Sequence, residues 1–221
     1  MSHPDLTFCL ISCGELTRDE CCERLHPQLN GFSYNEVKDV TPQAAALNEM
    51  INKCKTEYLV PLDADFLIYP NTVERIIKAI LDYENDPSWH SILFSVFDTQ
   101  TRIVGRSLKV FRHSIIKKFP YKDERFADKS HYINLIDAGY VAIDLTGQPP
   151  ITDHVVKGNY FSYMRMKDLF LCNYTGYAYS RNLPLRPLQR ARSLYEILNA
   201  NNDEDSKFGI MGIYDGLTGK S

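Results

Sequence analysis

Two aspartates separated by one residue, Asp63 and Asp65, follow the apolar run Tyr58–Leu62. A strand that ends in two carboxylates offers hard oxygen ligands for a divalent cation, and Mg²⁺ is commonly held by one or two carboxylates together with the phosphates of a substrate. Open α/β sheets place ligands at the carboxyl ends of their strands. Aspartate is also common in turns, so the pair alone leaves a metal site and an ordinary strand–loop junction open.

The elements that must position this pair alternate between strands and helices. Thr41 followed by Pro42 predicts the start of one helix, and Asn71 with Glu74 three residues later predicts another through a capping box. Such alternation is typical of a mostly parallel sheet with helices on both faces. Strands are expected at 6–12, 32–40, 57–62, 91–97, 103–111 and 140–145, and helices near 21–25, 42–54, 72–80 and 129–139.

Composition and charge narrow the class of protein. The chain has 221 residues, 44% of them hydrophobic and 24% charged, which is ordinary for one globular domain. A net charge of −3 disfavours a generally basic nucleic-acid binder. No apolar run approaches the roughly 18 residues of a membrane span. The adjacent pair Cys21-Cys22 suits a reducing compartment, so a cytoplasmic protein without a transmembrane segment is expected.

The run from Thr41 to Ile80 resembles the nucleotide-sugar half of a GT-A glycosyltransferase of family 2. The matching features are a helix that carries Asn48, a strand that ends in Asp63-Ala64-Asp65, and a helix that follows Pro70. The resemblance implies a GT-A type α/β fold, with a Rossmann-like, mostly parallel central sheet in a single compact domain. We expect residues 1–111 to bind the nucleotide sugar, 112–205 to form the acceptor and catalytic part, and 206–221 to be a loosely held tail.

The resemblance also implies a set of donor and metal ligands. Asp65 would bind Mn²⁺ or Mg²⁺ directly, and Asp63 would bind it through water or contact the ribose of the donor. His154 would be an additional metal ligand, a residue type that suits Mn²⁺ better than Mg²⁺; an ordinary loop histidine is the alternative. Asp39 and Asn48 are expected to contact the nucleotide-diphosphate sugar.

A second motif suggests a catalytic base. Phe126–Ser130 resembles the family's Glu-Asp motif, although Ala127 occupies the position of the usual glutamate. The resemblance implies that Asp128 removes the proton from the acceptor hydroxyl in an inverting reaction. Asp128 could instead cap the following helix, and Asp123 and Glu124 are rival bases.

These residues favour a metal-dependent glycosyltransferase that inverts the anomeric carbon. A retaining enzyme of the same fold and a non-catalytic nucleotide- or glycan-binding domain are the alternatives. A dehalogenase-type phosphatase is disfavoured, because Leu67 stands four residues after Asp63, where that class has threonine or valine. The acceptor, whether a glycan, a lipid-linked sugar or a protein, is not indicated. The chain is small for the family, so its acceptor side is expected to be open or completed by a partner chain, such as a second copy.

Overall fold

A mixed sheet forms the centre of the molecule in the computed structural model, which describes residues 4–124, 127–172 and 186–218. Within these residues the strand order is β2-β1-β3-β6-β5-β8-β4, and β7 pairs with β5. The strands are β1 (Leu6–Ser12), β2 (Ser33–Lys38), β3 (Tyr58–Asp63), β4 (Phe66–Ile68), β5 (Trp89–Asp98), β6 (Ile103–Arg112), β7 (Val141–Asp144) and β8 (Thr152–His154).

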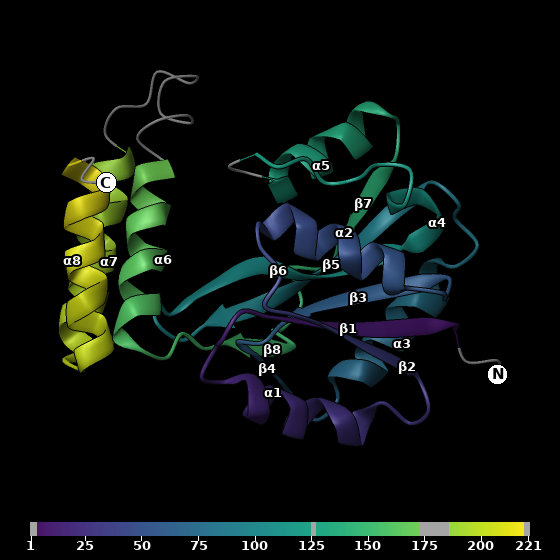
Figure 1. The fold of residues 1–221 in the computed structure, drawn as a ribbon, viewed down its shortest axis with the longest axis horizontal. Helices are drawn as coiled ribbons and strands as arrows, with labels where there is room; N and C mark the ends of the chain where they lie inside the picture. Colours follow the sequence, from purple (N-terminus) through teal and green to yellow (C-terminus); the bar gives the residue numbers. More distant parts are fainter. Residues whose placement is uncertain (1–3, 125–126, 173–185, 219–221) are drawn as a thin grey trace. The chain divides into compact units, whose positions relative to one another are not determined.

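Helices cover both faces of this sheet, as the sequence predicts. In Figure 1, α1 and α3 lie on one side of the sheet, and α2, α4 and α5 lie on the other. The helices are α1 (Arg18–Leu25), followed by a 3₁₀ turn η1 (His26–Gln28), then α2 (Gln43–Lys53), α3 (Thr72–Tyr83), α4 (His113–Ile116) and α5 (Ala127–Asp137). This arrangement confirms the predicted α/β fold of GT-A type.

One hydrophobic cluster joins α2, α4 and α5 to the sheet. Met50 of α2 packs with Leu59 of β3, Ile116 of α4 and Leu135 of α5, and all four side chains are buried. Met50 and its neighbour Ile51 lie on the buried face of α2. These helices share one core with β1 and β3. Packing in this core therefore fixes where the helices lie relative to the strands that end near Asp63.

Two helix starts differ from the sequence prediction. Pro42 is the N-cap of α2 rather than its first residue, and Gln43 begins the helix. Asn71 is the N-cap of α3, but its side chain makes no capping hydrogen bond. The hydroxyl of Thr72 donates instead to the backbone carbonyl of Ile151, so the start of α3 is tied to the segment before β8 and not closed by a capping box.

The chain divides into two compact units. Residues 1–97 and 104–154 form the first, and residues 98–103 and 155–221 form the second. The second unit contains α6 (Asn159–Cys172), α7 (Arg186–Asn201) and α8 (Glu204–Thr218). Its apolar core includes Phe170 of α6, Leu198 of α7 and Ile213 of α8. The predicted division at residue 111 into a donor and an acceptor part is a functional one and stays a prediction.

The sequence predicts a loosely held tail for residues 206–221, but α8 extends to Thr218, and residues 219–221 lie outside the described part of the chain. Glycines allow this helix to approach α6 closely, because a Cβ atom at Gly212 would collide with the backbone carbonyl of Tyr163. Gly212 therefore serves the packing of α8 against α6. Among the described residues, no helix combines the length and the apolar character needed to span a membrane.

Candidate functional site

Three parallel strands bring separate segments of the chain to one edge of the sheet. β1 pairs in parallel with β2 and with β3, in registers that place Ser12 opposite Lys38 and Ile11 opposite Asp63. Asp39 follows β2 directly, and its backbone amide donates to the Ser12 carbonyl at 2.8 Å. Its φ of 56° is a left-handed conformation that aspartate tolerates better than most residues. Asp39 and Asp63 thus reach the same carboxyl edge, because β2 ends at Lys38 and not at residue 40 as expected.

The loop between the two aspartates is fixed through Ala64. This residue is fully buried, and its amide donates to the carbonyl of Ile11 at 3.0 Å. Its carbonyl accepts a hydrogen bond of 3.0 Å from the hydroxyl of Thr17, the residue before α1. Asp63 is exposed on one side of this buried residue, and Asp65 is half-buried on the other. The loop therefore holds both carboxylates on a backbone that is bonded to β1 and to the start of α1.

His154 meets Asp65 because two short strands pair. β4 and β8 are antiparallel, with Phe66 opposite His154. The Nε2 atom of His154 lies 2.7 Å from Oδ2 of Asp65, and the His154 ring packs edge-on against Phe66 with centroids 5.4 Å apart. The sequence-predicted pair of Asp65 and His154 is thus in direct contact, although 89 residues separate the two.

The charges around Asp63 explain an altered pKa. The protein around this carboxyl displaces water even though its side chain reaches the surface, and this burial raises the pKa to about 6. The negative charge of Asp65 acts in the same direction, whereas His154 and Lys109 lower the pKa. Asp63 therefore lies within electrostatic reach of both Asp65 and His154, and of a lysine on β6.

The carboxylate oxygens at this edge suit a hard cation. Among the described residues, no three His, Cys, Asp or Glu side chains form a group that could hold a metal ion by themselves. Asp65 nevertheless has a free acceptor, because its Oδ1 atom is buried and has no hydrogen-bond partner in the described part of the chain. An unpartnered buried carboxylate oxygen is costly, and a cation there would satisfy it. Its remaining ligands would have to come from water or a bound phosphate.

Asp128 lies in the first turn of α5 and is exposed. It is the second helical residue, so it does not occupy the N-cap position that was the alternative to catalysis. Its charge is felt at Tyr121, where burial raises the phenol pKa most and the charges of Asp128 and Asp63 raise it further. One tyrosine thus lies within electrostatic reach of both the candidate base and the first aspartate of the loop.

Asn48 is predicted to contact the nucleotide-diphosphate sugar, but in the structure its side-chain amide makes hydrogen bonds within the protein. Its side-chain oxygen accepts from the amide of Tyr121 at 2.8 Å, and its side-chain nitrogen donates to the carbonyl of the same residue at 2.9 Å. Both ends of the amide are therefore engaged with the backbone of the segment before α5. A direct contact of Asn48 with the donor stays a prediction, and the structure shows a structural link in its place.

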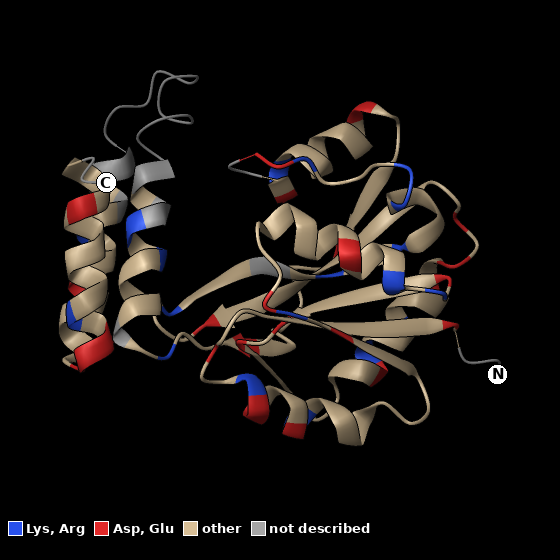
Figure 2. Cartoon of the chain, viewed as in Figure 1, with Lys and Arg blue, Asp and Glu red and all other residues tan. Residues whose placement is uncertain are grey.

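Sequence reasoning did not single out Thr17, Lys109 or Tyr121. The polar residues Thr17 and Tyr121 are recognised only through partners 47 and 73 residues away. Lys109 carried no distinctive local signal, since β6 also contains Arg106, Ser107 and Arg112. Figure 2 shows acidic and basic residues distributed over most elements of the first unit.

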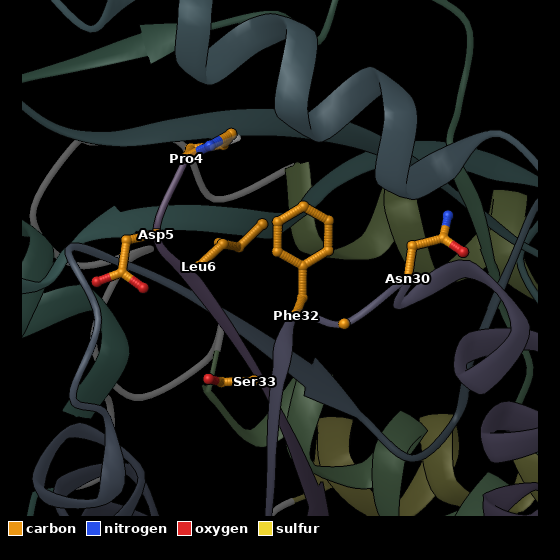
Figure 3. A pocket seen from close by; sticks show the side chains of 7 residues that line it. Pro4, Asp5, Leu6, Asn30, Phe32 and Ser33 are labelled. Atoms are coloured by element: carbon orange, nitrogen blue, oxygen red, sulfur yellow. The ribbon is translucent and has the colours of Figure 1, made fainter. Parts of the chain in front are cut away.

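A pocket of about 290 Å³ lies elsewhere in the first unit. Figure 3 shows the side chains around it, which come from the segments that lead into β1 and β2. It therefore opens at the amino ends of these strands, the opposite edge from Asp39 and Asp63. Its lining residues are Pro4, Asp5, Leu6, Asn30, Gly31, Phe32 and Ser33.

Comparison with solved structures identifies similar folds. A mannosyltransferase, PcManGT from Pyrobaculum calidifontis in complex with GDP-Man and Mn²⁺, matches with a TM-score of 0.57 and 13% identity over 100% of this chain and 89% of its own. Glucosyl-3-phosphoglycerate synthase from Mycobacterium tuberculosis, with Mg²⁺ and UDP, matches with a TM-score of 0.52 and 10% identity over 77% of this chain and 79% of its own. At such identities the likeness shows the fold alone.

A similar fold also occurs in a protein that is not named a glycosyltransferase. A 4-diphosphocytidyl-2C-methyl-D-erythritol synthase from Anaerococcus prevotii matches with a TM-score of 0.50 and 8% identity over 72% of this chain and 95% of its own. A search of curated proteins found no significant match. The family model for glycosyl transferase family 2, however, matches residues 22–137, which include Asp63, Asp65 and Asp128. Because that match covers more than half of the sequence, the chain belongs to glycosyl transferase family 2.

Proposed function

We propose that the chain transfers a sugar from a nucleotide-diphosphate sugar to an acceptor hydroxyl, with a bound divalent cation and with inversion at the anomeric carbon. The observation that carries the proposal is the unpartnered, buried Oδ1 of Asp65, next to His154 and at the carboxyl edge of the sheet. Family membership supports a glycosyltransferase. The complexes of similar structures with GDP-Man and Mn²⁺ or with UDP and Mg²⁺ support the choice of donor and cation.

In this proposal Asp65 and His154 hold Mn²⁺ or Mg²⁺, and Asp63 binds the ion through water or contacts the donor ribose. A bound divalent ion supplies charge neutralisation to the leaving diphosphate. Lys109, whose charge reaches Asp63, adds a further positive group near the same edge. Asp39, exposed beside the end of β1, is the residue of the set best placed to meet the nucleoside.

Asp128 acts as the base in the proposed reaction. It takes the proton of the attacking hydroxyl, a role that contributes about 10²–10⁴-fold to rates in enzymes. Its exposure in the first turn of α5 leaves the carboxylate accessible to an acceptor. The acceptor class, self-association and a cytoplasmic location stay predictions.

Donor binding with and without Mn²⁺ tests the metal role. Calorimetric titration of GDP-mannose and UDP-glucose should show binding that requires Mn²⁺ and that Asp65→Asn abolishes. Asp137→Asn is the matched control, since Asp137 is an exposed carboxylate at the end of α5. Binding that is equally strong in the presence of EDTA would contradict the metal role of Asp65.

Release of the nucleoside diphosphate tests the base. Asp128→Asn should keep Mn²⁺-dependent donor binding and lose at least about 10²-fold in the rate of release, whereas Asp137→Asn should keep both.

A non-catalytic binding domain is the second candidate, favoured by the lack of a preformed three-residue metal group in the described chain. Tight donor binding without any release by the unmodified protein would select that candidate.

A further inference from the structure

The side chain of Asn48 attaches α2 to the segment before α5. Asn48 makes two hydrogen bonds to the backbone of Tyr121, one to the amide and one to the carbonyl. This bidentate contact fixes both the position and the direction of the backbone at Tyr121. α2 packs on the same core as β1 and β3. The contact with Asn48 therefore holds the backbone of Tyr121 in place relative to the strands that end at the aspartate loop.

The ring of Tyr121 continues this connection into α5. It stacks on the imidazole of His131, with centroids 4.0 Å apart and an interplanar angle of 17°. Phe111 of β6 packs edge-on against the same imidazole at 6.2 Å, and His131 also bonds to the backbone of Phe119. The buried His131 is therefore held by a strand, by the preceding segment and by Tyr121.

His131 follows Asp128 by three residues in α5, and side chains at that spacing lie on neighbouring positions of a helix surface. We propose that Asn48, Tyr121 and His131 form a positioning unit that sets where Asp128 stands relative to Asp63. The inference rests on the proposed function, because it assigns these residues to the placement of the proposed base. None of the three needs to touch the substrate for this role.

Electrostatics supports the same placement. The charges of Asp128 and Asp63 both act on the phenol of Tyr121, so this member of the positioning unit lies within electrostatic reach of both parts of the proposed site. The unit thereby connects the carboxyl edge of the sheet, where the sugar donor binds in the proposal, to α5, which carries the proposed base Asp128. A shift of about 1 Å in a reacting group can cost about 10²-fold in rate, so a loosened α5 should lower turnover without weakening the donor site.

Hydrogen exchange of the full chain tests the connection itself. Asn48→Ala should accelerate the exchange of the α5 amides, whereas Asn52→Ala should not. Asn52 is the matched control, because it lies one turn later on α2 and its side chain is exposed. Tyr121→Phe keeps the ring and the backbone contacts and should leave exchange in α5 unchanged, while Tyr121→Ala should accelerate it. Unchanged exchange in both Asn48→Ala and Tyr121→Ala would overturn the inference.

A double-mutant cycle tests whether the unit acts through Asp128. With Mn²⁺ and a saturating concentration of whichever of GDP-mannose and UDP-glucose binds, Asn48→Ala should lower nucleoside diphosphate release about 10²-fold. In the Asp128→Asn background the same substitution should cause no further loss, since residues that act as a unit are not additive. An equal loss in both backgrounds would show a general structural effect and overturn the positioning role. Full activity of Asp128→Asn alone would instead refute the proposed base.

Discussion

Replacing His90 by phenylalanine should make the stability of the first unit less sensitive to acid. His90 lies on β5 and is fully buried, and neither of its ring nitrogens has a hydrogen-bond partner among the described residues. Burial lowers its pKa to about 4, and the nearby His131 and Lys109 act in the same direction. The pKa of His131 is likewise lowered to about 4, chiefly by burial. The folded unit therefore keeps both imidazoles neutral in mild acid.

The unfolded chain behaves differently, because its histidines take up protons near pH 6.5. Between about pH 6.5 and pH 4 the unfolded state binds more protons than the folded state, so the free energy of unfolding falls as the pH falls. From about pH 7.5 to pH 5, each histidine should remove about 2 kcal/mol. Asp63 acts in the opposite direction, because its raised pKa lets the folded state bind a proton first. Comparison with a histidine variant separates the two effects.

Trp89, the single tryptophan of the chain, provides the assay. It is fully buried and stacks on Tyr58 with centroids 5.7 Å apart, so its fluorescence should report unfolding of the first unit. Urea unfolding at about pH 7.5 and pH 5 should show that His90→Phe loses about 2 kcal/mol less than the unmodified protein. His26→Phe, at an exposed position, should lose as much as the unmodified protein. An equal loss in His90→Phe would refute the argument that a neutral, buried His90 causes the acid sensitivity.

Three further perturbations test other parts of the structure. Thr17→Val removes the hydroxyl bonded to the Ala64 carbonyl and should cost about 1–3 kcal/mol in urea unfolding, together with weaker Mn²⁺-dependent donor binding. Gly212→Ala introduces a clash with the Tyr163 backbone and should cost about 1–3 kcal/mol in thermal unfolding of the second unit, whereas alanine at the exposed Met211 should be nearly neutral. Chelation by EDTA should lower donor affinity in calorimetry, and added Mn²⁺ should restore it; affinity that does not change would contradict a metal-dependent site.

The parts of the fold that could be predicted from the sequence carry local signals. The apolar run at Tyr58–Leu62 predicts β3, and Thr41-Pro42 predicts the start of α2 to within one residue. The parallel pairing of β1 with β2 and β3 then brings Asp39 and Asp63 to one edge. β4 and β8 contain three residues each, too few for a strand pattern to be recognised. Their pairing delivers His154 to Asp65, so that contact followed only from the resemblance and not from any local pattern.

Asn48 and the glycines of α8 show why the remaining features could not be predicted. A helical asparagine in the expected motif suggests a donor contact, but the partner that engages it, Tyr121, is 73 residues away. Glycine-rich sequence at the C-terminus suggests flexibility, yet Gly212 meets the backbone of another helix. In both cases the observed contact joins residues far apart in the sequence, so no local pattern could indicate it.

The register between β4 and β8 decides the chemistry of the candidate site. A slip of one residue would exchange the two faces of β8 and bring Asp153 in place of His154 toward Asp65. Asp153 is held on its own side, because its carboxylate accepts a hydrogen bond from the hydroxyl of Tyr69. The amide of Tyr69 also donates to the Ile151 carbonyl at 3.1 Å. Tyr69 therefore holds the register through both its side chain and its backbone. This register places an imidazole rather than a third carboxylate beside Asp65.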